Sequence, residues 1–81
     1  MAEVDIFTTI NALSDEEEAL YEHAGDGHGL TAEELERIAE IKIQLDRCYD
    51  LLHQRAGRRA AGLDPNEAAA RSAAVVETYE Q

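Results

Sequence analysis

The feature that most constrains this chain is one long helix, from Leu30 to Gly62, with both ends encoded locally. Thr31 and Glu34 have capping-box spacing, in which each side chain accepts a hydrogen bond from a backbone N–H group of the first turn. Gly62 is a typical stop signal. Between these ends, apolar residues recur in steps of three and four, and so share one stripe: Leu35, Ile38, Ile41, Leu45, Cys48 and Leu52. We expect a helix over about residues 32–61 that needs a partner for this stripe.

A second amphipathic helix is expected over about residues 5–24, with Asp5 as its N-cap. Its stripe follows the same steps and consists of Ile6, Ile10, Leu13, Leu20 and Ala24. Three glycines within residues 25–29 end this helix, because glycine adopts backbone conformations that a helix does not contain. Two amphipathic helices joined by so short a turn predict an antiparallel helical hairpin over residues 1–62.

The remaining residues, 63–81, are expected to form a short helix and a tail. Asp64, Pro65 and Glu67 suit the N-cap, first and third positions of a helix that ends near Arg71. Beyond Ser72 the pattern fits either a further helix or an extended segment. A chain of 81 residues has a marginal core of its own. The predicted fold is therefore all-α, with two hairpins associated as a dimeric four-helix bundle.

The two predicted helices differ in length. At a rise of about 1.5 Å per residue, the first spans about 30 Å and the second about 45 Å. We therefore expect the end of the second helix, from Leu51 and Leu52 through the arginines at 55–59, to extend beyond the first helix. A second copy of the chain or the C-terminal segment would then cover the two leucines.

The charge of the chain is unevenly distributed. The net charge is −11, and residues 1–30 contain eight acidic residues and no Lys or Arg. Such acidity disfavours non-specific binding to nucleic acid or anionic membranes.

The single cysteine, Cys48, excludes an intramolecular disulfide and indicates a reducing compartment. No segment approaches the ~20 apolar residues of a membrane span, and the N-terminus lacks the pattern of a signal peptide. We expect a cytoplasmic protein without membrane contact.

One pair of residues has the spacing of a metal site. Asp50 and His53 form the carboxylate-x-x-His pattern of di-iron helical bundles, and a dimer of hairpins would supply two copies. A complete site also needs a glutamate from each first helix, and only Glu3 comes near. This alternative predicts a metal-binding ferritin-like oxidase, whereas the plainer interpretation is two polar residues that flank Leu51 and Leu52.

Other candidate sites are weaker. Four residues near the turn could bind a divalent ion, although the glycines oppose a preorganised site: Glu22, His23, Asp26 and His28. Cys48 would need a nearby base to act as a nucleophile, and a small core residue is the simpler interpretation. We therefore predict no catalytic residue and no cofactor.

The arginines at the end of the long helix are the best candidates for a functional surface. Arg55, Arg58 and Arg59 complement the helix dipole there, and arginine is suited to bidentate pairing with carboxylate or phosphate. The acidic first helix of another chain is the nearest candidate partner, and RNA or the ribosome is the alternative for this patch. The tail adds three possible anchor residues for a protein partner: Val75, Val76 and Tyr79. The predicted function is a non-enzymatic interaction module, either an adaptor or a regulatory subunit.

Several stretches resemble a known family. They are the core from Gln44 to Leu52, QLDRCYDLL, the Gln54-Arg55-x-x-Arg58-Arg59 stretch, and the Asp64-Pro65 step. Together they resemble a family of short actinobacterial proteins classed as a domain of unknown function, in which an aromatic residue follows the cysteine, as Tyr49 does here. The resemblance implies a small helical protein without a known activity.

Overall fold

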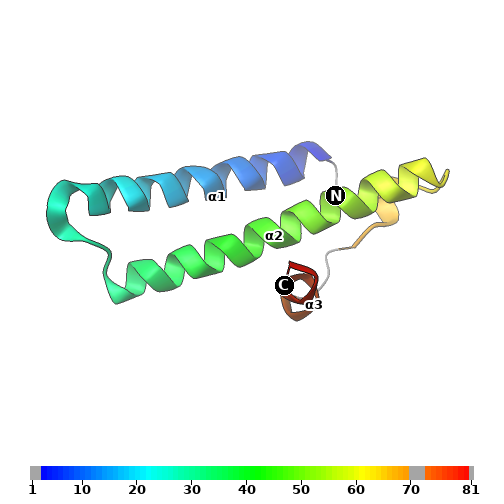
Figure 1. Ribbon diagram of the computed structural model, residues 1–81. Helices are drawn as coiled ribbons and strands as arrows, with labels where there is room; N and C mark the ends of the chain where they lie inside the picture. Colours follow the sequence, from blue (N-terminus) through cyan, green and yellow to red (C-terminus); the bar gives the residue numbers. More distant parts are fainter. Residues whose placement is uncertain (1–2, 70–72, 81) are drawn as a thin grey trace.

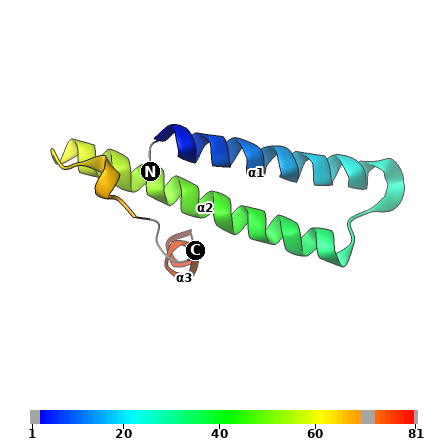
Figure 2. The same cartoon turned by 180° about the vertical axis from the view of Figure 1, so that it is seen from behind.

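The chain folds into helices and turns in the computed structural model, which describes residues 3–69 and 73–80. The helices are α1 (Glu3–His23), α2 (Ala32–Ala60) and α3 (Ala73–Glu80), and no strand occurs in those ranges. A turn, η1 (Ala24–His28), follows α1 and contains Gly27 with a left-handed φ of 94°, and a 3₁₀ turn, η2 (Pro65–Glu67), precedes α3. Figure 1 shows α1 and α2 side by side, with α3 on the other side of α2; the reverse view in Figure 2 agrees. The predicted all-α fold is confirmed.

Both ends of α2 form as the sequence predicts. The backbone N–H of Thr31 donates to Oε1 of Glu34 at 2.9 Å, and the Glu34 N–H donates to Oγ1 of Thr31 at 3.1 Å. At the other end, the N–H of Gly62 donates to the Arg59 carbonyl and the N–H of Leu63 donates to the Arg58 carbonyl. This Schellman arrangement requires a left-handed residue, and Gly62 supplies it with φ 76°.

The helix α1 begins earlier than predicted. The assignment of Asp5 as N-cap is wrong, because Glu3 and Asp5 both lie in the first helical turn. Carboxylates in the first turn stabilise a helix because they interact favourably with the positive end of its dipole. The helix then continues without a break to His23.

The segment after α2 also differs from its prediction. The expected helix from Pro65 to Arg71 is a single 3₁₀ turn, and Ala68 already has an extended backbone; Arg71 lies outside the described residues. Side chains of α2 take up the carbonyl groups of this segment, since Arg55 donates to the Pro65 carbonyl and Gln54 to the Ala69 carbonyl. Of the two alternatives for the residues beyond Ser72, the helix is the one found, as α3.

The core is a thin row of aliphatic side chains between the helices. Its buried members are Ile6, Ile10 and Leu13 of α1, Ile38, Ile41 and Leu51 of α2, and Val76 of α3. The expectation that Leu51 extends beyond α1 is wrong, because Leu51 packs against Ile6 and Ile10. Ile6 and Ile10 already lie within the predicted helix of residues 5–24, so it is the register of the two helices that differs from the prediction.

Leu35 departs from the predicted stripe, since 54% of its surface is exposed. Two successive steps of three residues separate Leu35 from Ile38 and Ile41, and at about 100° per residue they place Leu35 about 120° around the helix from the fully buried Ile41. Leu35 lies at the start of α2 and has rotated away from the core there.

The molecule is flat and long. Its principal extents are 52 × 25 × 14 Å and its radius of gyration is 15.2 Å, whereas a compact domain of this length would have a radius of about 12 Å. Among the described helices, none combines the length and apolar character needed to cross a bilayer. A single layer of helices leaves two broad faces open to contact.

Candidate interaction surface

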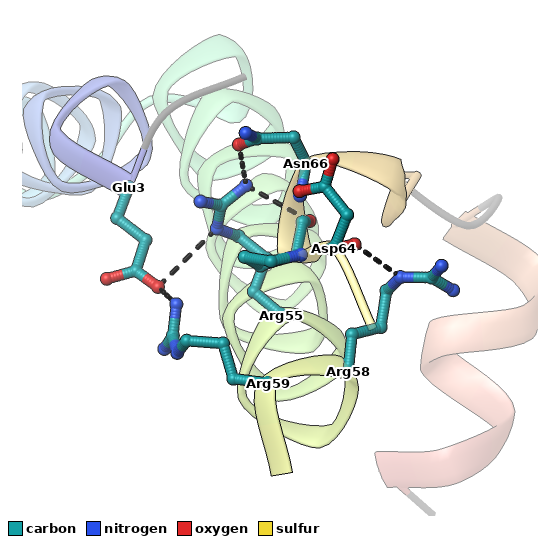
Figure 3. A network of polar contacts seen from close by, with 7 residues as sticks. Glu3, Arg55, Arg58, Arg59, Asp64 and Asn66 are labelled. Carbon is teal, nitrogen blue, oxygen red and sulfur yellow. Dashed lines mark hydrogen bonds and ion pairs between the residues drawn. The ribbon is translucent and has the colours of Figure 1, made fainter. Parts of the chain in front are cut away.

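Arg55 is the buried centre of a polar cluster at the end of the hairpin. Only 6% of its surface is exposed, and its Nη1 donates to the Pro65 carbonyl and to Oδ1 of Asn66, both at 3.2 Å. Its Nε lies 3.5 Å from Oε1 of Glu3 (Figure 3). One guanidinium thus connects α2 to the first turn of α1 and to η2.

The neighbouring arginines also have partners within the chain. Arg58 donates from Nε to the Asp64 carbonyl at 2.7 Å, whereas Arg59 pairs with Glu3 (Figure 3). Arg58 also donates from Nη2 to Glu67 at 2.6 Å. Long side chains on a helix lean towards its N-terminus. Those of Glu3 and Arg59 therefore approach each other across the antiparallel pair.

The expectation that the arginine group lies beyond the packed register is wrong for Arg55. Arg59 remains about half exposed and Arg58 about one-quarter exposed. A contact between these arginines and a partner stays a prediction, and it now concerns the outer two residues.

The predicted tail anchors have different surroundings. Val76 is 1% exposed, so it is part of the core of this chain. Val75 and Tyr79 lie in α3, but their side chains are outside the described part of the structure. A docking role for Val76 would require α3 to leave the surface of α2.

The candidate metal ligands do not form a site within one chain. His53 is exposed, and Asp50 accepts a hydrogen bond from Gln54 at 2.9 Å. In residues 3–69 and 73–80, no group of three or more His, Cys, Asp or Glu side chains could hold a metal ion. At the turn, Glu22 and His23 are exposed, whereas the side chains of Asp26 and His28 are not described. Ligands from a second chain would be needed at Asp50 and His53.

Cys48 fits the interpretation of a core residue. It is half-buried and packs against the cluster of Ile6, Ile10 and Leu51. Burial raises the pKa of its thiol, which disfavours the reactive thiolate.

One broad face of the hairpin carries an ion pair. Arg37 of α2 donates to both carboxylate oxygens of Glu16 of α1, at 2.5 and 2.8 Å, and to Glu40 at 3.2 Å. The hydrogen bonds from the guanidinium lower the pKa of Glu16. This face is therefore polar and already paired.

The opposite face carries the exposed apolar side chains. Five large apolar residues of the two long helices are 46–68% exposed: Val4, Phe7 and Tyr21 of α1, and Leu35 and Tyr49 of α2. Each belongs to a second stripe with steps of three and four, beside the core stripe. These stripes are residues 4, 7, 11, 14, 18 and 21 of α1 and residues 35, 39, 42, 46, 49 and 53 of α2, which we call the open face.

The two stripes lie on the same side of the hairpin. Phe7 follows the buried Ile6, and Lys42 follows the buried Ile41, each by one residue or about 100° of rotation. In antiparallel helices, the same rotation away from the shared core leads to the same side of the pair. Glu16 and Arg37 are rotated in the opposite sense, and their ion pair fixes the other side.

Sequence reasoning did not identify the open face. Phe7 and Tyr21 lie 14 residues apart on α1, and the stripe positions between them are polar (Asn11, Ser14 and Glu18), so hydrophobic periodicity gives no continuous signal. The exposure of the large apolar side chains identifies this face.

The sequence comparisons match the resemblance noted above. Residues 2–81 match the family described as a protein of unknown function, DUF2630. The chain belongs to this family. Its relatives include uncharacterised proteins of Mycobacterium bovis and of two Mycobacterium tuberculosis strains, each 43% identical over 70 residues. These alignments cover 86% of this chain and 80% of each relative. No solved structure matches.

Proposed function

We propose that this member of the DUF2630 family is a non-enzymatic interaction module, an adaptor or regulatory subunit that works as a dimer. In this proposal, the open faces of two hairpins pack together and form a four-helix bundle. The observation that carries the proposal is the gathering of Val4, Phe7, Tyr21, Leu35 and Tyr49 on one face. Helical hairpins bury such a stripe by packing against another pair of helices.

The surface area of the chain supports association. The accessible surface is 5417 Å², whereas a compact monomer of 8.9 kDa would expose about 4,800 Å². The excess of about 600 Å² approaches the roughly 800 Å² that each partner buries in a standard interface. A second hairpin on the open face would remove an area of this order.

Sedimentation at micromolar concentration tests the proposal. We expect a mass near twice 8.9 kDa, and substitution of Phe7→Glu should shift the protein towards the monomer. Ala12→Glu is the matched control, because Ala12 is exposed on α1 away from the open face and gains the same charge. A wild-type monomer at all accessible concentrations would remove the proposal.

A further protein partner could use the end of α2 and the tail. Arg59 is half exposed there, and Leu63 is 53% exposed beside it. The RNA alternative is less well supported, because Glu3 and Glu67 already neutralise charge in the arginine group.

The oxidase alternative would place Asp50 and His53 of two chains around one metal. Elemental analysis of the purified dimer, with His53→Ala as control, tests it.

A further inference from the structure

We infer that the dimer partner is a second copy whose helix α2 lies on α1 of the first copy, with the two-fold axis parallel to the helices. This inference rests on the proposed self-association through the open face. It adds the orientation of the two hairpins and the residues that meet. In this arrangement, every helix is antiparallel to both of its neighbours.

The charges of the two long helices favour this orientation. The range of α1 contains seven acidic residues and no Lys or Arg, so its formal charge is −7, whereas the range of α2 has six acidic and six basic residues and is neutral. Two face-to-face orientations satisfy two-fold symmetry. One stacks α1 on α1 and α2 on α2, and therefore brings two helices of charge −7 together. The other stacks each α1 on the neutral α2 of its partner, and like-charge repulsion favours it.

The register within one chain determines which residues would meet. A two-fold axis parallel to the helices preserves every level along them. A residue of α1 that lies level with a residue of its own α2 therefore lies level with the same residue of the partner's α2. Ile6 and Ile10 pack against Leu51, and Glu16 pairs with Arg37 nearer the turn; the mean register of these contacts places Phe7 near the level of Tyr49. The aromatic side chains of Phe7 and of Tyr49 of the partner subunit would then pack together.

The other positions of the open face are also compatible with the inferred orientation. Continued towards the turn, the same register brings Tyr21 to the level of Leu35 and Glu18 to that of Ala39. Lys42, the one lysine of the chain, is exposed on the open face. Its side chain leans by about one turn towards Ala39, and therefore towards Glu18 of the partner subunit. The pair occurs twice in a symmetric dimer.

The alternative orientation gives different pairs. With the two-fold axis across the helices at the level where Phe7 meets Tyr21 of the partner subunit, Ser14 would face Ser14 of the partner subunit, and Lys42 would face Lys42 of the partner subunit. The apolar ends would still meet, since Phe7 would lie on Tyr21. Charge therefore distinguishes the two orientations, whereas apolar contact does not.

Charge reversal at Glu18 and Lys42 is the first test. In the inferred orientation, Lys42→Glu should weaken the dimer about tenfold, because two exposed ion pairs become two repulsive contacts. Adding Glu18→Lys in the same chain should restore most of the loss. In the alternative orientation, Lys42→Glu exchanges one like-charge pair for another, and Glu18→Lys restores nothing. Dissociation constants from sedimentation measure both effects.

Disulfide trapping is the second test, in a Cys48→Ala background checked for helicity by circular dichroism. Chains with Asn11→Cys mixed with chains carrying Asp46→Cys should form a covalent heterodimer, because these positions are level in the inferred orientation. Ser14→Cys alone should form no covalent dimer. A dimer that is trapped through Ser14→Cys and not through the mixed pair would overturn the orientation alone. A chain that stays monomeric would overturn the proposed function itself.

Discussion

Removal of the Arg55 guanidinium should weaken the fold, although sequence spacing suggested a surface residue. Arg55→Met keeps most of the buried alkyl chain and removes the charged group. The lost contacts are two hydrogen bonds, to the Pro65 carbonyl and Asn66, and the ion pair with Glu3. Hydrogen bonds from charged donors contribute about 1.5–3 kcal/mol each when buried. The energies of both hydrogen bonds must be reduced here, because the Pro65 carbonyl keeps the Ala68 N–H as a donor and Asn66 is exposed to solvent.

We take about 1 kcal/mol for each hydrogen bond and about 0.5 kcal/mol for the ion pair, since the Glu3 side chain is about one-third exposed. The new apolar contacts of methionine offset about 0.5 kcal/mol of this loss of stability. The expected loss is about 2 kcal/mol, a large share of the total stability of an 81-residue chain.

Urea unfolding followed by circular dichroism measures the free energy of unfolding at a fixed protein concentration, because a dimer would gain stability with concentration. The matched control is Arg59→Gln, which removes a half-exposed guanidinium and should cost less than about 1 kcal/mol. The reasoning would be refuted by equal effects of the two substitutions, or by a loss below about 0.5 kcal/mol for Arg55→Met.

Three further outcomes are expected. Leu51→Ala should cost about 2–5 kcal/mol, whereas Leu35→Ala should cost much less in the monomer because the side chain is exposed; thermal melting of both substitutions in the Phe7→Glu background, where we expect the monomer, gives the comparison. Gly62→Ala should destabilise the protein by about 1 kcal/mol in urea unfolding, because φ is 76° at this position, and an unchanged midpoint would contradict the Schellman assignment. The folded-state pKa values of Glu16 and Glu34 are lowered from 4.5, so their contribution to stability is present above that pH and is lost as the pH falls below it; Glu16→Gln together with Glu34→Gln should flatten this acid dependence of the melting temperature.

The candidate surface was only partly predictable. The arginine group was recognised from its clustering, but its partners Glu3 and Asn66 are distant in sequence or lie in a turn that was expected to be a helix. The open face was not encoded by continuous apolar spacing, because polar residues separate Phe7 from Tyr21 along its stripe. Spacing alone does not say how much of a stripe one neighbouring helix will cover.

The sequence alone determined the features that depend on atoms a few residues apart. The capping box of Thr31 and Glu34 and the stop at Gly62 are local hydrogen-bond arrangements, so they form wherever the helix forms. The apolar periodicity of both long helices, together with the short turn between them, determined the hairpin in the same way.

Only the tertiary structure decided the register and the end of the hairpin. Arg55 is buried because α1 begins at Glu3 and the Pro65 turn folds back against α2, which brings acceptors from α1 and from η2 to one guanidinium. Gln54 and Arg55 of α2 donate to the Ala69 and Pro65 carbonyls, and the segment leaves helical geometry after one 3₁₀ turn, although its local signals favour a longer helix. Burial depends on what lies opposite a side chain, and neither periodicity nor a cap contains that information. Packing against α1 buries Leu51 and leaves Leu35 exposed, although both are leucines of the same amphipathic helix.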